Sequence, residues 1–315
     1  MAEAADRTSG GASGPSGRAD GTILFTIGMI GVFWGLNWPA MKVMLTEVPP
    51  FTIRAVALSG AALVLAGICR ATGQRLIPPL RELPWMALTG LLSVFGFNIL
   101  VIIGQTLTEA SKAAIIAYTM PAMTAVLSAV LLGERLSGRR LAALGMGMAG
   151  IAVLLSQDFG AVIAAPAGAL VMLGSALSWA LGTVAMKAGR FTLAPMGLTV
   201  WFLGLSGLAS WPLVAVWEAG WWADPVLSWP VAAVWAWHAF MPMVVCYALW
   251  TSLVGRLPAS LAAIATLLAP FVGVSSAILL LGEPASWQKG LALALVLGSI
   301  ALGFLRLPRV FAGAG

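Results

Sequence analysis

Charged residues are scarce in this sequence, and their scarcity limits the solvents in which the chain can fold. Only 9% of the 315 residues are Asp, Glu, Lys or Arg, whereas 60% are hydrophobic. An ordinary soluble domain has roughly 25% charged residues, so most of this chain cannot face water. The composition excludes an ordinary soluble globular domain and predicts a polytopic membrane protein, because a bilayer core needs roughly 20 apolar residues per helix.

Cysteine and histidine are nearly absent as well. The two cysteines, Cys69 and Cys246, lie within or at the end of apolar runs and lack the paired spacing of a zinc site. We therefore expect no disulfide framework, no metal site and no cofactor. The net charge of +6 comes from basic residues scattered between apolar runs. Such scattering indicates membrane topology and not a nucleic-acid-binding patch.

Apolar runs fill the chain after a polar beginning. Residues 1–20 are rich in Ala, Gly, Ser and Asp, so we expect a disordered tail there and no cleaved signal peptide. Residues 307–315 form a second predicted tail. Runs bounded by charge or by Pro and Gly clusters predict ten transmembrane helices. These helices cover roughly 22–45, 51–69, 84–104, 112–133, 140–156, 166–187, 194–216, 231–254, 259–281 and 287–305.

Basic residues predict the orientation of these helices. With the N-terminus inside, only Lys42, Arg54, Lys112 and Lys289 of the 17 Lys and Arg fall on the outer side. Cytoplasmic loops carry an excess of Lys and Arg. Both termini are therefore expected in the cytoplasm, and the protein in the inner (plasma) membrane of a bacterium.

The sequence repeats itself at long range. The segment from Trp34 to Lys42 recurs from Trp179 to Lys187, 145 residues further on. A second set recurs at an offset of 149 residues: Ala110-Ser111, Pro121 and Gly133-Glu134 reappear as Ala259-Ser260, Pro270 and Gly282-Glu283. Each repeat, 21–157 and 166–306, holds five predicted helices. Because five is odd, the second repeat enters the membrane inverted, an arrangement that secondary transporters use to enclose a midplane site.

These motifs resemble those of a known family. Its pattern is matched by Trp34-Gly35-x-Asn37-x4-Lys42, by Arg54 early in the second predicted helix, and by Pro121 followed by Gly133-Glu134-Arg135. This combination resembles the EamA-type drug/metabolite transporter superfamily over roughly residues 22–305. The resemblance implies an all-α fold of ten helices around a central cavity. It also implies export of small metabolites, with amino-acid exporters, among them exporters of aromatic amino acids, as a large group.

Polar and aromatic residues at mid-membrane depth are the candidates for the cavity wall. An Asn amide in lipid must find a partner or a water-filled space, so Asn37 and Asn98 either face the cavity or bond to another helix. Aromatic residues either line a pocket for apolar side chains or simply pack. The predicted cavity residues are Trp34, Asn37, Trp38, Asn98, Tyr118, Trp179, Thr183, Tyr247 and Trp250.

A second group of candidates lies near the membrane boundary. Long cationic side chains can extend to the interface, so Lys42, Arg54 and Lys112 are expected to anchor the helices, with gating pairs of Lys42 or Arg54 with Glu109 as the alternative. The single histidine, His238, is either an interfacial residue with a hydrogen-bond partner or a proton-coupling group.

Gly145-Met-Gly147-Met-Ala-Gly150 matches a dinucleotide-binding fingerprint, but that motif needs a preceding strand. Inside an apolar helix, small residues indicate close helix packing.

The groups that the membrane interior lacks narrow the function. No Asp or Glu falls in the central part of any predicted span, whereas proton-driven carriers usually keep an intramembrane carboxylate. No catalytic constellation and no channel filter is evident, so no catalytic residue is assigned and an enzyme is not expected.

A zwitterionic small molecule is the expected substrate, with amino acids favoured. The alternative is a multidrug or other metabolite exporter, proton-coupled or not. Besides the substrate and the lipid bilayer no partner is expected, and the protein is predicted to be a monomer.

Overall fold

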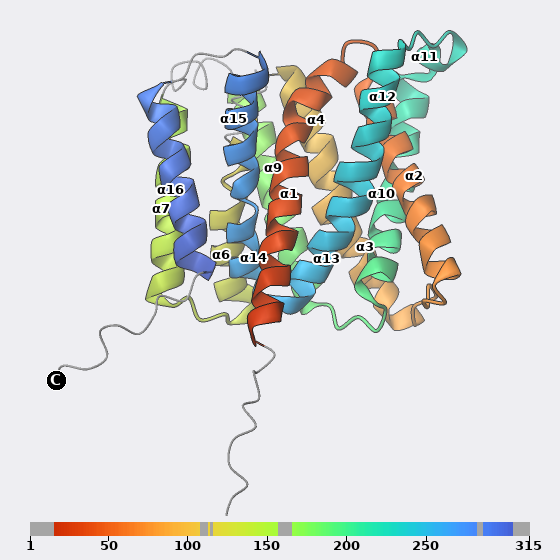
Figure 1. Ribbon diagram of the computed structural model, residues 1–315. Helices are drawn as coiled ribbons and strands as arrows, with labels where there is room; N and C mark the ends of the chain where they lie inside the picture. The colour runs from red at the N-terminus through yellow and green to blue at the C-terminus, as the bar shows by residue number, and fades with distance from the viewer. Residues whose placement is uncertain (1–15, 108–112, 114–115, 157–165, 282–285, 305–315) are drawn as a thin grey trace, which may run out of the picture.

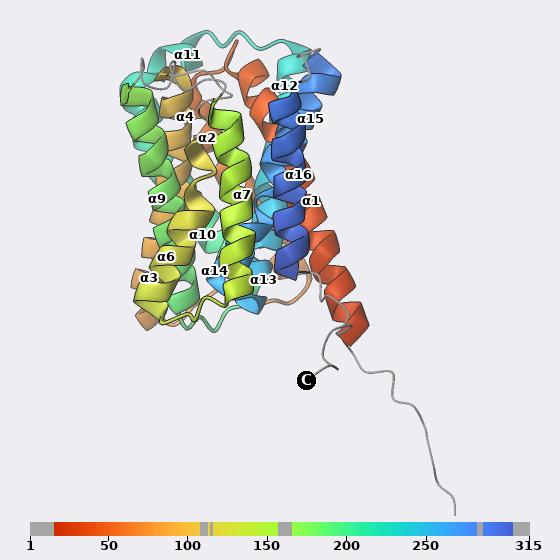
Figure 2. The ribbon, with the colours of Figure 1, turned by 90° about the vertical axis from the view of Figure 1, so that its left-hand side faces the viewer.

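The structure is a computed structural model that describes residues 16–107, 113, 116–156, 166–281 and 286–304. All regular secondary structure in these ranges is helical, as predicted. The long axes of the helices run roughly parallel and antiparallel in one bundle (Figures 1 and 2). Glu109 and Lys112 lie outside the described residues.

Within the described ranges, six helical stretches are long and apolar enough to cross a membrane. Three belong to the first repeat: α1 (Ser16–Met44), α2 (Pro50–Ala71), and a continuous stretch of η1 (Leu80–Glu82), α3 (Leu83–Thr89), η2 (Gly90–Gly96) and α4 (Phe97–Leu107). The second repeat supplies α9 (Pro166–Ala188), α10 (Pro195–Trp217), and a stretch of α12 (Trp229–His238), η3 (Ala239–Cys246) and α13 (Tyr247–Arg256).

Shorter helices complete the bundle. The first repeat ends with α6 (Met120–Leu132) and α7 (Gly138–Ser156). The second ends with α14 (Ala259–Ala265), α15 (Leu268–Leu281) and α16 (Trp287–Phe304), and a short α11 (Ala219–Ala223) lies between α10 and α12.

The two repeats have opposite directions and equivalent packing. In Figure 1, α1 runs upward and α9 runs downward, and α1 begins at the same face of the bundle at which α16 ends. Helix α1 packs on α15, and its counterpart α9 packs on α6; α2 packs on its counterpart α10, and α7 on α16. Each of these four interfaces is thus either matched in the other repeat or shared between the repeats, as expected for two units related by a pseudo-two-fold axis.

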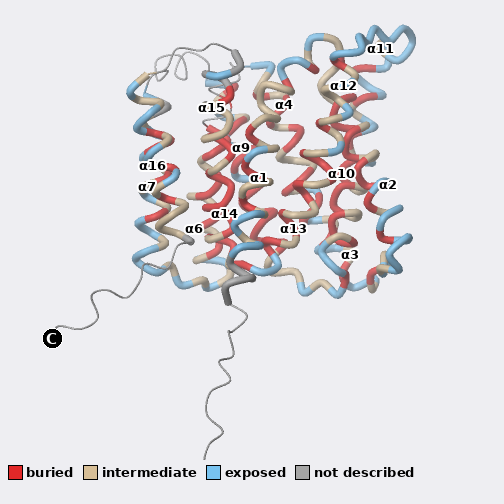
Figure 3. The backbone as a smooth tube through the Cα atoms, viewed as in Figure 1, coloured by how far each residue is buried: buried red, intermediate tan, exposed pale blue. Residues whose placement is uncertain are grey.

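The core lies where these interfaces meet (Figure 3). Trp179, Trp250 and Phe202 are among the largest fully buried side chains, whereas apolar residues such as Leu63 and Val130 are exposed on the outside of the bundle. A soluble protein rarely exposes so many apolar residues together. The outer surface is therefore the lipid-facing one.

Small residues allow the helices to approach closely. A Cβ atom at Gly35 in α1 would lie 2.7 Å from the backbone oxygen of Ala269 in α15. At Gly147 and Gly150 in α7 it would lie 2.5 Å from Leu267 and 3.0 Å from the oxygen of Ala292. The packing interpretation of the glycine motif is confirmed at these two positions, whereas Gly145 faces open space.

Glutamates near the ends of the bundle bind the first residues of other helices. The Glu218 carboxylate accepts hydrogen bonds from the backbone N–H groups of Phe51 (2.8 Å) and Thr52 (2.6 Å) in the first turn of α2. Glu134 accepts bonds from the backbone of Ala259 (2.8 Å) and the hydroxyl of Ser260 (2.9 Å) at the start of α14. Negative charge is favourable at these positions, because the first N–H groups of a helix have no intrahelical partner. Glu134 belongs to the repeated Gly-Glu motif, and its counterpart Glu283 lies outside the described residues.

Among the described glycines, the tightest contact with a backbone atom of another helix generates a prediction about stability. A Cβ at Gly182 in α9 would lie 2.4 Å from the backbone nitrogen of Ser93 in η2, so Gly182→Ala must push two helices apart. Overpacking of this kind typically costs about 1–3 kcal/mol, and we expect a lower melting temperature of the purified protein in detergent. Gly145→Ala is the matched control and should melt at or above the wild-type temperature. Equal melting temperatures for the two variants would contradict the packing described here.

Candidate substrate pocket

Two π-helical segments at equivalent positions of the repeats shape the centre of the bundle. They are η2 and η3, and each is followed directly by an α-helix that carries a polar residue in its first turn, Asn98 in α4 and Tyr247 in α13. A π-helical turn widens the helix and is frequent at functional sites. The Asn98 amide donates hydrogen bonds to the Val94 carbonyl oxygen (2.8 Å) and to the Tyr247 hydroxyl (2.7 Å), 149 residues away. Two repeat-equivalent residues therefore bond to each other between the halves.

Aromatic rings surround this hydrogen bond. The repeat-equivalent Trp34 and Trp179 pack edge to face with ring centroids 5.3 Å apart, and Phe97 lies 4.8 Å from Trp179. Trp34 donates its indole N–H to the Pro242 carbonyl oxygen in η3 (3.2 Å), and Trp38 donates to the Tyr118 hydroxyl (2.8 Å). The indole groups of Trp34 and Trp38 thus have partners within the protein and present their ring faces to the centre of the bundle.

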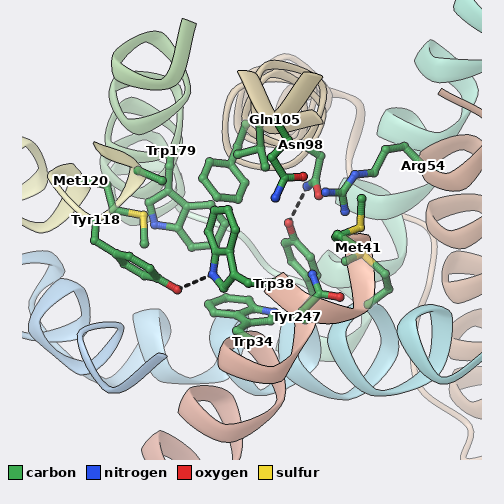
Figure 4. A pocket seen from close by; sticks show the side chains of 15 residues that line it. Trp34, Trp38, Met41, Arg54, Asn98, Gln105, Tyr118, Met120, Trp179 and Tyr247 are labelled. Atoms are coloured by element: carbon green, nitrogen blue, oxygen red, sulfur yellow. Dashed lines mark hydrogen bonds between the residues drawn. The ribbon is translucent and has the colours of Figure 1, made fainter. Parts of the chain in front are cut away.

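A pocket of about 60 Å³ lies among these rings (Figure 4). One end is aromatic; the other is polar, where Arg54, Asn98 and Gln105 converge. Seven predicted cavity residues line it: Trp34, Asn37, Trp38, Asn98, Tyr118, Trp179 and Tyr247. A water molecule occupies about 30 Å³ in the liquid, and pockets for small-molecule ligands usually measure about 300–1,000 Å³. The pocket is therefore contracted in this conformation and must widen to hold an organic solute.

Two predicted cavity residues do not line the pocket. Thr183 is fully buried and donates its hydroxyl hydrogen to the carbonyl oxygen of Trp179 (2.9 Å), as threonines in helices often do. Trp250 is 1% exposed and packs against Trp179, with ring centroids 5.2 Å apart. Both side chains support the wall from behind, because neighbouring residues cover them on the pocket side.

Asn37 was predicted either to face the cavity or to bond to another helix, and it does both. It lines the pocket, and its Oδ1 atom also lies 2.6 Å from Nδ1 of His238 in α12. His238 is 0% exposed, so it is not the interfacial residue that the sequence predicted. A hydrogen-bonded partner is present, but it is found in the interior, where α12 packs on α1.

Arg54 occupies a different position from the one expected. It is 2% exposed and its side chain lines the pocket, so its guanidinium does not extend to the membrane surface. Nε and Nη1 are buried and have no hydrogen-bond partner, and the nearby Glu218 is engaged by the backbone of α2. Lys42, by contrast, is exposed, as a boundary residue should be.

Several apolar lining residues were not predicted as site residues. Met41, Phe97, Val101, Met120 and Met243 line the pocket together with Ala117, and the polar Gln105 lines it as well. Helical spacing is the signal that identifies some of them. Met41 follows Trp34 and Trp38 on one face of α1, and Val101 and Gln105 follow Asn98 at intervals of three and four residues.

These features are those of a multi-pass helical membrane protein built from two repeats around a central pocket. A family model identifies which one: the EamA-like transporter family matches residues 21–156 and again residues 166–305. The chain belongs to this family.

Individual relatives agree with this assignment. An uncharacterized transporter of Bacillus subtilis, YvbV, is 29% identical, over 86% of this chain and 88% of its own. A probable amino-acid metabolite efflux pump of Escherichia coli is 28% identical, over 84% and 88%. The aromatic amino acid exporter YddG of Ancylobacter novellus is 31% identical over 55% of this chain and 64% of its own. A crystal structure with 21% identity has the same fold, with a TM-score of 0.75 over 90% of this chain and 97% of its own.

The contact between half-buried Asn37 and buried His238 can be tested by a double-mutant cycle. Asn37→Leu and His238→Phe should each lower stability, by about 1–3 kcal/mol, because each leaves the other side chain without its hydrogen-bond partner. The double variant should cost less than the sum of the two, since partners in direct contact are not additive. Thermal unfolding of purified protein in detergent measures all four states. Strict additivity would show that the contact contributes nothing to folding.

Proposed function

We propose that this chain is a secondary carrier that exports amino acids with apolar or aromatic side chains. The observation that carries the proposal is the division of the pocket into an aromatic end, with Trp34, Trp38 and Trp179, and a polar end, with Arg54 and Asn98. Burial against the aromatic end stabilises a side chain by about 25 cal/mol per Å² of apolar surface. The printed names of two relatives, an amino-acid metabolite efflux pump and an aromatic amino acid exporter, support the same substrate class.

The transport cycle that we propose is alternating access between the two inverted repeats. Among the described residues, three shorter apolar helices add to the six long ones, and we propose that α7 is the tenth membrane-crossing helix. The contracted pocket is a closed form in this cycle. When the pocket widens toward one face of the membrane, contacts of one repeat open, and when it widens toward the other face, the equivalent contacts of the other repeat open. We further propose that the protein acts as a monomer in the inner membrane.

We propose that the substrate's own gradient drives transport. Among the described residues, no carboxylate lines the pocket, and Glu47, Glu134 and Glu218 accept hydrogen bonds from backbone N–H groups near helix starts. A proton-coupled carrier or an exporter of organic cations usually needs an acidic group at the site. The described part of the pocket offers none.

Reconstituted protein tests the substrate class and the energetics together. Proteoliposomes should carry Phe, Trp, Met and Leu down their gradients without an imposed pH difference. They should carry Asp and Lys more slowly, because a charged side chain at the aromatic end of the pocket would have no partner there, which costs several kcal/mol. Uptake of radiolabelled amino acids measures this, with protein-free liposomes as the blank. Flux that appears only with a proton gradient, or only for organic cations, would refute the proposal.

The aromatic end can be tested with a pair of tryptophan variants. Trp38→Ala should reduce the preference for Phe over Asp, because Trp38 lines the pocket. Trp229→Ala is the control, since Trp229 is 82% exposed, and the preference should be unchanged in that variant. The ratio of initial uptake rates for the two amino acids is the readout. If both variants showed the same reduction, the pocket would not be the cause of the preference for Phe over Asp.

Fusions of reporter proteins test the proposed orientation. The excess of Lys and Arg predicts both ends of the chain in the cytoplasm, so green fluorescent protein fused to the C-terminus should fluoresce, and alkaline phosphatase at the same position should be inactive. Active phosphatase would contradict the orientation.

A further inference from the structure

Arg54 is a buried cation whose donors are not used. It is 2% exposed, and its Nε and Nη1 atoms have no hydrogen-bond partner. Burying an unpaired charge costs several kcal/mol. Within a membrane, cationic side chains of this kind usually mark a binding or transport site.

The surroundings of Arg54 explain why it lacks a protein partner. Its side chain points from α2 into the pocket and toward Asn98 (Figure 4), but neither Nε nor Nη1 donates a hydrogen bond to the Asn98 amide oxygen. The nearby carboxylate, Glu218, accepts from the backbone N–H groups of Phe51 and Thr52 instead. Among the described residues, therefore, Arg54 has no anion with which to pair.

A second unused polar group lines the same pocket. The Oε1 atom of Gln105 is buried and has no hydrogen-bond partner. Gln105 and Arg54 lie at the same end of the pocket, opposite Tyr118 and Trp179 (Figure 4). The Arg54 guanidinium is a positively charged donor, and the Gln105 amide oxygen is a neutral acceptor. A guanidinium complements an α-carboxylate, and an amide oxygen complements the α-ammonium group beside it.

We propose that Arg54 binds the carboxylate of the transported amino acid and that Gln105 accepts a hydrogen bond from its ammonium group. The proposal rests on the proposed function and specifies its recognition chemistry. A charged hydrogen bond to a guanidinium is stronger than a neutral one and gives geometric selectivity. With the polar groups of the substrate held at this end, its side chain lies toward the rings of Trp34, Trp38 and Trp179.

Three ligands and three variants test this assignment by binding alone. The ligands are phenylalanine, 3-phenylpropionate (a carboxylate without the ammonium group) and 2-phenylethylamine (an ammonium without the carboxylate), and calorimetry on purified protein measures each affinity. Arg54→Met should lose affinity for phenylalanine and 3-phenylpropionate by about 10- to 100-fold. Its affinity for 2-phenylethylamine should be equal or higher, because a repelling cation has been removed.

Gln105→Met should give the opposite pattern. Its affinity for phenylalanine and 2-phenylethylamine should fall by about 3- to 10-fold, as expected for loss of one acceptor, whereas 3-phenylpropionate should bind as in the wild type. Lys42→Met is the matched control for charge, since Lys42 is an exposed cation and does not line this pocket. All three affinities should be unchanged in that variant.

Folding is monitored separately, by the melting temperature without ligand. Removal of an unpaired buried charge should leave this temperature equal or higher in Arg54→Met. If that variant does not fold, Arg54→Gln provides the second neutral substitution with the same expected pattern. A lower melting temperature together with unchanged ligand selectivity would show a structural role and overturn the proposal.

The outcomes separate this inference from the proposed function. If the wild type transports amino acids but Arg54→Met shows no selective loss of carboxylate binding, the role of Arg54 is overturned and the proposed function stands. Absence of amino-acid transport would overturn the proposed function, and the Arg54 assignment is then decided by whether the wild type binds 3-phenylpropionate more tightly than the neutral 3-phenylpropanamide. Equal binding of those two ligands would overturn it.

Discussion

A polar group inside a bilayer has no water to bond, so it must find its partner within the protein. The structure follows this constraint at several levels. Buried hydroxyl groups such as that of Thr124 bond to their own helix, indole N–H groups such as that of Trp34 reach carbonyl oxygens of neighbouring helices, and glutamates at the ends of the bundle bind the free N–H groups of helix starts. Several buried polar atoms lack a partner, and those of Arg54 and Gln105 belong to residues that line the pocket.

The scaffold is nearly symmetric between the repeats, but the pocket is not. Asn98 pairs with its own counterpart Tyr247, and Trp34 packs on its counterpart Trp179. The polar end breaks the symmetry: the position of Arg54 in the second repeat is occupied by Thr199, whose hydroxyl bonds to Thr251 (2.9 Å). Likewise, Asn37 corresponds to Gly182, which packs against Ser93. A symmetric frame supports alternating access, whereas an asymmetric pocket allows a substrate to bind in a single orientation.

The pocket of about 60 Å³ also limits which steps a transport cycle can contain. Packed aromatic rings resist gradual compression, because protein interiors are close-packed. Widening therefore requires the helices that carry Trp34 and Trp179 to separate. The π-helical segments η2 and η3 lie next to these helices and interrupt the regular hydrogen-bond ladder. They are natural positions for such a change, because irregular turns bend more easily than uniform α-helix.

The class of the protein could be predicted from the sequence, because the length of an apolar run predicts a membrane-spanning helix and the 145- and 149-residue offsets predict two repeats. The sequence also indicated Trp34, Asn98 and Tyr247, since polar and aromatic groups at mid-membrane depth must face partners or a cavity. Which side of each helix faces the pocket depends on the tertiary structure. Thr183 and Trp250 are buried but do not line the pocket. Arg54 lines the pocket, although its position near the start of α2 had suggested that its side chain extends to the membrane surface. Helix rotation and side-chain direction are set by packing between distant segments, such as α2 against α10 and α1 against α15, and no local pattern in the sequence specifies that packing.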